Sequence, residues 1–240
     1  MVLLLVMFVS LSAHIEISTV LELLRSNWVL VLLFALAFLL PRIPVVGKFF
    51  NIINTALHEF GHALMALVTG GSVDKIELFK DTSGTTTTKS SSKFSAILVS
   101  LVGYPFAASV AWLSFYLIRQ GAEQGLVIGL SLLFVVMLLF WIRNWYGALW
   151  VVLFCVGNGL LLYYGEPDWL HYVALFYAVM ILVESVTSTI TIVVLSIRDG
   201  SRAGDATNLA KTTHVPAFFW ALLFLAYTGW VCYRVVLLLL

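Results

Sequence analysis

Charged residues are scarce in this sequence of 240 residues. Asp, Glu, Lys and Arg together make up 10% of it, against about 25% in an average soluble domain. Hydrophobic residues make up 62%, and the mean hydropathy is +1.05. This composition excludes an ordinary soluble domain and predicts a protein that crosses a lipid bilayer several times.

Two other features are nearly absent. The 13 basic and 12 acidic residues leave a formal net charge of +1, so no overall field would attract nucleic acid, and we expect no nucleic-acid partner. The only cysteines, Cys155 and Cys232, lie in apolar runs, where a thiol usually behaves as a small buried hydrophobe. They indicate neither a disulfide framework nor a cysteine-based metal site.

Long apolar runs dominate the sequence instead. The fold class we expect is an all-α polytopic membrane protein with about six to seven transmembrane helices, forming a single membrane-embedded domain over residues 28–240. The first run is the least regular, because Pro41 and Pro44 interrupt it. Residues 1–27 are apolar but lack the basic start of a cleaved signal peptide, so we expect an interfacial or partly inserted segment. The expected spans are residues 28–46, 49–69, 94–118, 126–142, 145–164, 169–197 and 215–240.

One sizeable polar insertion, residues 70–93, follows the second span. Val73, Ile76, Leu78 and a run of threonines favour strands, and "DTSG" between them is typical of a turn. We therefore expect a small β-hairpin, whose unpaired edge could hold an extended substrate by strand addition. A solvated surface loop is the simpler alternative.

Basic residues are distributed unevenly over the expected connections. With seven spans, the N-terminus and the connections at 70–93, 143–144 and 198–214 share one side of the membrane. The positive-inside rule predicts that this more basic side is cytoplasmic, with the bacterial inner membrane as the expected location. Its basic residues are Arg25, Lys75, Lys80, Lys89, Lys93, Arg143, Arg198, Arg202 and Lys211, against Arg42, Lys48, Arg119 and Arg234 on the other side.

The segment "NTALHEFGHALMALVTGG", residues 54–71, places ionisable side chains within an expected span. Each such group costs about 2.5 to 3.5 kcal/mol at mid-membrane, so a chance HExxH pattern is the weaker interpretation. On a helix His58 and His62 project from one face and can hold one Zn²⁺, while Glu59 reaches a metal-bound water as general base. Gly61 would allow another helix or a substrate backbone to approach closely.

A catalytic zinc site needs a third protein ligand. Besides Glu59, the only carboxylate within the spans is Glu184, which could alternatively orient a ligand histidine or pack in the bundle. The connection at 198–214 offers Asp199, Asp205 and His214 on the side where the HExxH helix ends, and a helix start that dips inward could reach the site. Asp205 could also be an N-cap, and Asp199 a turn residue.

Several motifs together resemble one family. HEFGHA followed by TGG, then "VSLVGYPFAASVAW", "RNWYG" and "GDATNLAKTTHVPAFFWALL", resemble the small bacterial and fungal branch of the site-2 protease class, the peptidase M50B-like intramembrane zinc metallopeptidases. The resemblance covers residues 51 to about 225. It implies that His58 and His62 are zinc ligands, that Glu59 is the catalytic acid/base and that Asp205 is the third ligand, with Asp199 of "RDG" as its rival.

The sequence departs from that family in one motif. Site-2 proteases carry Gly-Pro-x-x-Asn on the helix after the β insertion, and here Gly103 and Pro105 are present but Ala108 stands where the asparagine would fall. Asn144 or Asn158 could replace it, although an asparagine in a membrane bundle more often joins two helices.

The predicted function is that of an intramembrane zinc metalloprotease, which hydrolyses peptide bonds of membrane-spanning or membrane-adjacent substrates. Its expected cofactor is Zn²⁺, and its expected partners are a membrane protein substrate and the lipid bilayer. One alternative is a catalytically silent membrane protein of the same fold that acts in binding, scaffolding or chaperoning. Another is a zinc protease of the prenyl-protein type, which would use Glu184 as its third ligand.

Overall fold

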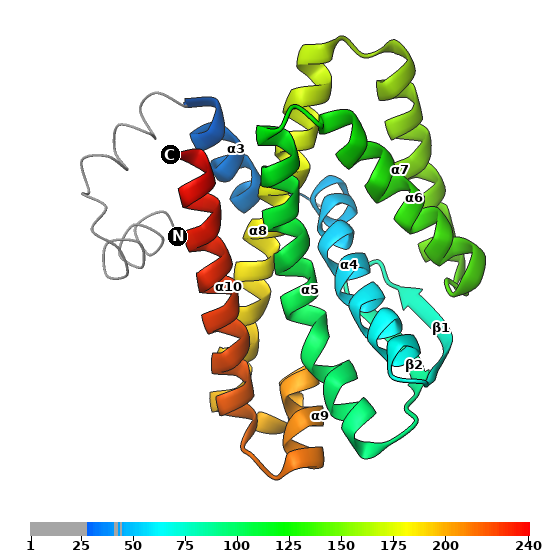
Figure 1. Ribbon diagram of the computed structural model, residues 1–240, viewed down its shortest axis with the longest axis vertical. Coiled ribbons are helices and arrows are strands. Elements are labelled where there is room, and N and C mark those ends of the chain that lie inside the picture. Colours follow the sequence, from blue (N-terminus) through cyan, green and yellow to red (C-terminus); the bar gives the residue numbers. More distant parts are fainter. Residues whose placement is uncertain (1–27, 41–42, 44) are drawn as a thin grey trace.

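The computed structural model describes residues 28–40, 43 and 45–240, so the segment expected at 1–27 lies outside the described residues. Helices form nearly all of it, and the expected all-α polytopic fold class is confirmed (Figure 1). The elements are α3 (Trp28–Leu39), α4 (Val46–Val68), β1 (Ser72–Leu78), β2 (Gly84–Lys89), α5 (Lys93–Arg119), α6 (Glu123–Phe140), α7 (Trp145–Tyr164), α8 (Pro167–Arg198), η2 (Gly200–Arg202), α9 (Gly204–Thr213) and α10 (Ala217–Leu239).

Five of these helices, α5, α6, α7, α8 and α10, are long and apolar enough to cross a membrane. In the apolar window of each, between 28% and 50% of the residues are buried inside the protein. At least half of each window therefore remains available for contact with lipid, as a membrane-spanning helix requires. The protein is an integral membrane protein.

The two helices that precede the hairpin differ from those five. α3 has 12 residues and ends at Leu39, shortly before Pro41 in the sequence. It is too short to cross a bilayer alone, which corrects the span expected at 28–46. α4 has 23 residues, carries the HExxH motif, and packs against α5, α8 and the hairpin inside the bundle.

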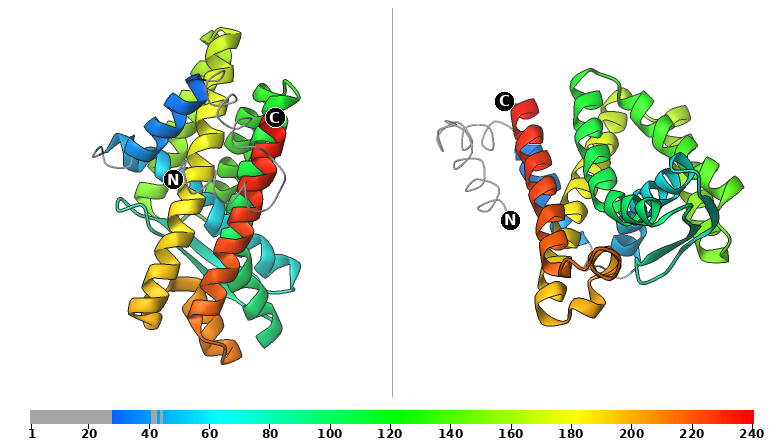
Figure 2. Two further views of the ribbon diagram at one scale, coloured as in Figure 1. Left: turned by 90° about the vertical axis from the view of Figure 1, so that its left-hand side faces the viewer. Right: turned by 60° about the horizontal axis from the view of Figure 1, so that its bottom comes forward.

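α5 is the central helix of the bundle, since it packs against α4, α8, α9 and α10 (Figures 1 and 2). Its contact with α4 is close because Gly61 has no side chain. A Cβ atom at Gly61 would lie 2.9 Å from the Cβ of Phe106 and 3.5 Å from the Cα of Gly103. The close approach that Gly61 predicts is therefore present, and α5 is the helix that makes it.

The polar insertion forms the expected β-hairpin. β1 and β2 pair antiparallel, with Ile76 opposite Thr86 and Leu78 opposite Gly84. The Asp81 carboxylate accepts hydrogen bonds from the main-chain N–H and the hydroxyl of Ser83, which closes the turn.

The two edges of this hairpin differ. The outer edge of β1 binds the connection between α6 and α7: Ile76 N–H donates to the Trp141 carbonyl at 2.8 Å, and Arg143 N–H donates to the Ile76 carbonyl at 3.1 Å. The Asn144 side chain adds two bonds to the main chain of Leu78. In the part of the chain that the structure describes, β2 pairs with β1 alone, so its other edge has no strand partner.

The hairpin, the α6–α7 connection and α9 lie toward one end of the bundle (Figures 1 and 2). The alternation of helices had predicted that these three connections share one side. This arrangement brings α9 toward the HExxH segment of α4.

Candidate metal centre

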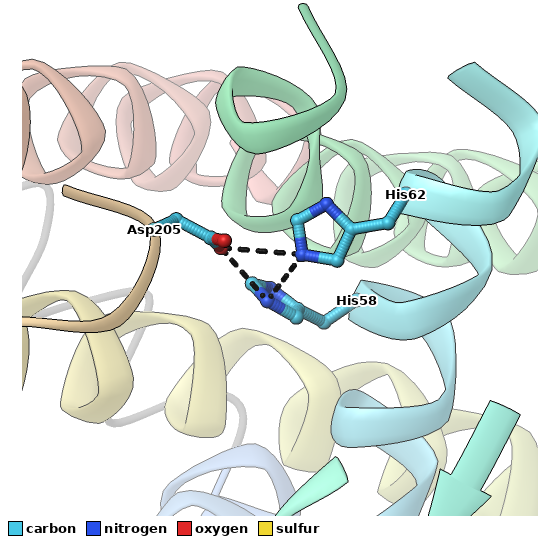
Figure 3. A group of neighbouring side chains, drawn as sticks. All are labelled: His58, His62 and Asp205. Carbon is cyan, nitrogen blue, oxygen red and sulfur yellow. Dashed lines mark hydrogen bonds and ion pairs between the residues drawn. The ribbon is translucent and has the colours of Figure 1, made fainter. Parts of the chain in front are cut away.

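The polar side chains of this part of α4 lie on two faces of the helix. His58 and His62, one turn apart, point toward α9 (Figure 3). Thr55 and Glu59, also one turn apart, contact the hairpin. An uninterrupted helix produces both pairs, because residues at i and i+4 lie on the same face.

Asp205 completes a compact group with the two histidines. The Nε2 atoms of His58 and His62 are 2.9 Å apart, and they lie 3.1 and 3.2 Å from Oδ2 of Asp205 (Figure 3). In a tetrahedral zinc site with bonds of about 2.0 to 2.1 Å, ligand atoms are roughly 3.3 Å apart. The three atoms thus fit one face of such a site, and no other group of this kind occurs among the described residues.

The start of α9 leaves the Asp205 carboxylate free for this role. Ala203 N–H donates to the Thr207 hydroxyl oxygen, and that hydroxyl donates to the Gly200 carbonyl, so Thr207 holds the helix start. Gly204 has a φ of 51°, which a glycine adopts without strain. Asp205 lies in the first turn and is not the N-cap residue, so the alternative N-cap role is not found.

The charge of Asp205 suits a cation. Burial alone would raise the pKa of its carboxyl group, but positive charge at the two imidazoles, His62 first, and hydrogen bonding to both rings lower that pKa well below its usual range, so a cation held there would keep the carboxylate ionised. One carboxylate and two imidazoles are a ligand set typical of catalytic zinc.

Residues of α5 contact both imidazole rings and fix their orientation. His62 Nδ1 lies 2.7 Å from the Val99 carbonyl, which can only accept, so Nδ1 carries the proton and Nε2 presents its lone pair. The ring of His58 packs edge-on against Tyr104, with centroids 4.5 Å apart. A Cβ at Gly103 would lie 2.5 Å from Cε1 of His58 and 2.7 Å from Cε1 of His62, so only glycine leaves room for both rings.

Glu59 belongs to the same pocket but not to the ligand group. Its Oε2 accepts a hydrogen bond of 2.6 Å from the Thr86 hydroxyl. The pocket has a volume of about 450 Å³, and α4, α5, α8, α9 and hairpin residues 82–86 all contribute to its lining. Glu59 therefore shares one cavity with the group of His58, His62 and Asp205, and residues 84–86 of β2 also line it.

The rival third ligands lie outside the group. Asp199 accepts hydrogen bonds from the hydroxyl and N–H of Ser201, which lower its pKa, and it pairs with Arg202 at 3.3 Å. It therefore has the turn role that was its alternative. His214 is the exposed left-handed residue that ends α9, and Glu184 does not line the pocket.

The asparagines considered as replacements at Ala108 are also engaged elsewhere. Both polar atoms of the Asn144 amide bind the main chain of Leu78. Asn158 donates to the Ser131 hydroxyl and accepts from the Tyr177 hydroxyl. Neither lines the pocket, so this expectation is wrong.

The structure also reveals site residues that the sequence did not single out, namely Gly84, Thr86 and Tyr104. Strand alternation could have shown that Gly84 and Thr86 share one face of β2. Nothing in a run of four threonines indicates which one contacts Glu59.

A family model described as Peptidase M50B-like matches residues 29–235. Comparison with curated proteins and with solved structures gives no match. The matched range contains the histidine pair of α4, the hairpin and Asp205 of α9.

Proposed function

The chain belongs to the peptidase M50B-like family, and from this premise we propose that it is an intramembrane zinc metalloprotease that cleaves membrane-spanning or membrane-adjacent proteins. The observation that carries the proposal is the convergence of two imidazole nitrogens and one carboxylate oxygen within 2.9 to 3.2 Å. Membership confirms the resemblance to the site-2 protease class, while the bacterial and fungal branch stays a prediction.

His58, His62 and Asp205 are the residues that would hold the metal. Bound zinc would polarise the scissile carbonyl and lower the pKa of a water molecule to about 7. The Val99 carbonyl keeps His62 in the tautomer that can act as a ligand, and Gly103 lets both rings keep their positions.

Glu59 is the proposed general base and later the general acid. Its Oε2 is occupied by the Thr86 hydroxyl, whereas no hydrogen bond to Oε1 is formed by any described residue. Oε1 is therefore the oxygen that would accept the proton of the attacking water and return it to the leaving amine. Glu59 and His62 are themselves buried, which limits their contact with bulk water.

β2 is the proposed substrate-binding element. Its free edge adjoins the pocket through residues 84–86, so an extended segment that pairs with β2 would lie beside Glu59. A substrate helix would have to unwind first, because its main-chain groups are otherwise bonded within the helix. The excess of basic residues in the connections at this end supports a site nearer the cytoplasm, and the proposed location is a bacterial inner membrane.

The test compares purified wild type, Glu59→Gln and His58→Ala in detergent, with zinc content and cleavage of a transmembrane substrate measured together. Glu59→Gln should keep its zinc and lose about 10² to 10⁴ of its cleavage rate, since a positioned base contributes that much. His58→Ala should lose both. Equal cleavage by wild type and Glu59→Gln would refute the mechanism, and zinc-loaded wild type that cleaves nothing would favour the silent scaffold.

A further inference from the structure

Strand β2 contacts Glu59 at two positions on one face. The Thr86 hydroxyl lies 2.6 Å from Oε2 of Glu59 and 3.1 Å from its main-chain carbonyl. Two residues earlier, a Cβ at Gly84 would lie 2.7 Å from Cγ and 2.8 Å from Oε1 of Glu59. One strand therefore supplies both the hydrogen-bond donor for one carboxylate oxygen and the space for the other.

This strand is firmly fixed relative to α4. The Thr55 hydroxyl, one helical turn before Glu59, donates to the Thr82 carbonyl at 2.7 Å. On its other side β2 pairs with β1, and β1 is bonded to the α6–α7 connection through Ile76. The Thr86 hydroxyl is thus a fixed point in the pocket.

Glu59 itself needs such a point. A glutamate side chain has three rotatable bonds, and among the described residues only Thr86 forms a hydrogen bond with its carboxylate. A short bond from a hydroxyl to an ionised carboxylate is among the stronger hydrogen bonds in proteins. Loss of this bond would leave the carboxylate free to occupy several rotamers, and a misplacement of about 1 Å can cost 10²-fold in rate.

We propose that Thr86 is the positioning residue of Glu59. This inference rests on the proposed function. The hydroxyl holds Oε2 and leaves Oε1 toward the space at Gly84.

The first test is kinetic and uses full-length zinc-loaded protein in detergent. Thr86→Val keeps the shape of the side chain but removes the donor, so kcat should fall about 10-fold to 100-fold while KM changes by less than about twofold. Thr86→Ser restores the donor and should recover most of kcat. Thr88→Val is the matched control, since Thr88 is also half-buried on the same strand face and no hydrogen bond joins it to Glu59.

Two kinetic outcomes would overturn the inference: a kcat for Thr86→Val equal to that of Thr88→Val, or a Thr86→Ser variant as impaired as Thr86→Val. Glu59→Gln in the same assay separates this failure from that of the proposed function. If only the inference is wrong, Glu59→Gln is still inactive while Thr86→Val is active.

The second test needs neither metal nor activity. Thermal unfolding of the metal-free protein is measured for Thr86→Val, Glu59→Ala and the double variant. Both single changes remove the same hydrogen bond, so the Tm loss of the double variant should be smaller than the sum of the two single losses. Additive losses would show that the two side chains are independent and would refute the positioning role, whether or not the protein is a protease.

Discussion

Two buried polar clusters in this bundle are built in opposite ways. In the cluster around Asn158, donors and acceptors alternate: the amide donates to the Ser131 hydroxyl at 2.9 Å and accepts from the Tyr177 hydroxyl at 2.7 Å. In the cluster of α4 and α9, two Nε2 atoms and the Oδ2 of Asp205 converge on one point.

The difference separates a structural polar cluster from a functional one. A closed network satisfies its own hydrogen bonds and joins α6, α7 and α8 without any further partner. The converging cluster has more acceptor atoms than donors when His62 is neutral. The Nδ1 proton of His62 is then donated to the Val99 carbonyl, and no proton is left on Nε2. A cation would supply what this arrangement lacks, which is why we propose it as the metal site.

The largest expected effect is on zinc affinity, and it comes from removing one member of the converging cluster. Asp205→Ala removes the one carboxylate oxygen that contacts both histidines, so zinc affinity should fall by more than the roughly 10 to 100-fold seen when a supporting residue is lost. Zinc content and competition with a chelator measure this directly. Asp199→Ala is the control and should bind zinc like wild type; zinc loss in that variant, with retention in Asp205→Ala, would reverse the assignment.

A smaller effect is expected from adding one methyl group behind the rings. Gly103→Ala would place a Cβ within 2.7 Å of both imidazoles, so at least one must move, and cleavage should fall by about 10-fold or more. Gly129→Ala on α6, where nothing lies within 4 Å of the added atom, is the matched control. Equal activity of the two variants would mean that the rings tolerate displacement.

These residues also show how far the sequence alone could lead. The His58–His62 pair and the hairpin were predictable because both depend on local spacing along one helix or between adjacent strands. The role of Gly103 was not, since the rotation of α5 against α4 depends on the packing of the whole bundle. The role of Asn144, one of two asparagines considered for the pocket, was not predictable for the same reason, because its partner Leu78 lies in a distant part of the sequence.

Asp205 was predicted through the family resemblance, whereas the residues themselves left Asp199, Glu184 and His214 open. Only the fold of the 198–214 connection decides which side chain turns inward. Thr207 makes that difference, because it holds the start of α9 and leaves the carboxylate of Asp205 to the histidines.

The smallest expected effect concerns the closed network. Asn158→Leu removes two hydrogen bonds, and at roughly 0.6 kcal/mol per interhelical bond the free energy of unfolding should fall by about 1 kcal/mol. Zinc content should not change, because no atom of this network lines the metal pocket. Unfolding in mixed detergent and metal analysis test both statements, and zinc loss in Asn158→Leu would contradict the separation of the two clusters.

The placement of the ligands on α4 and α9 also sets an order in time. A ribosome that adds about 5 to 20 residues per second completes the histidines on the order of 10 s before Asp205, and four membrane-crossing helices are made in between. Throughout that interval the HExxH helix lacks the carboxylate that we propose as its third metal ligand. The proposed metal site can therefore be completed only after α9 has been made.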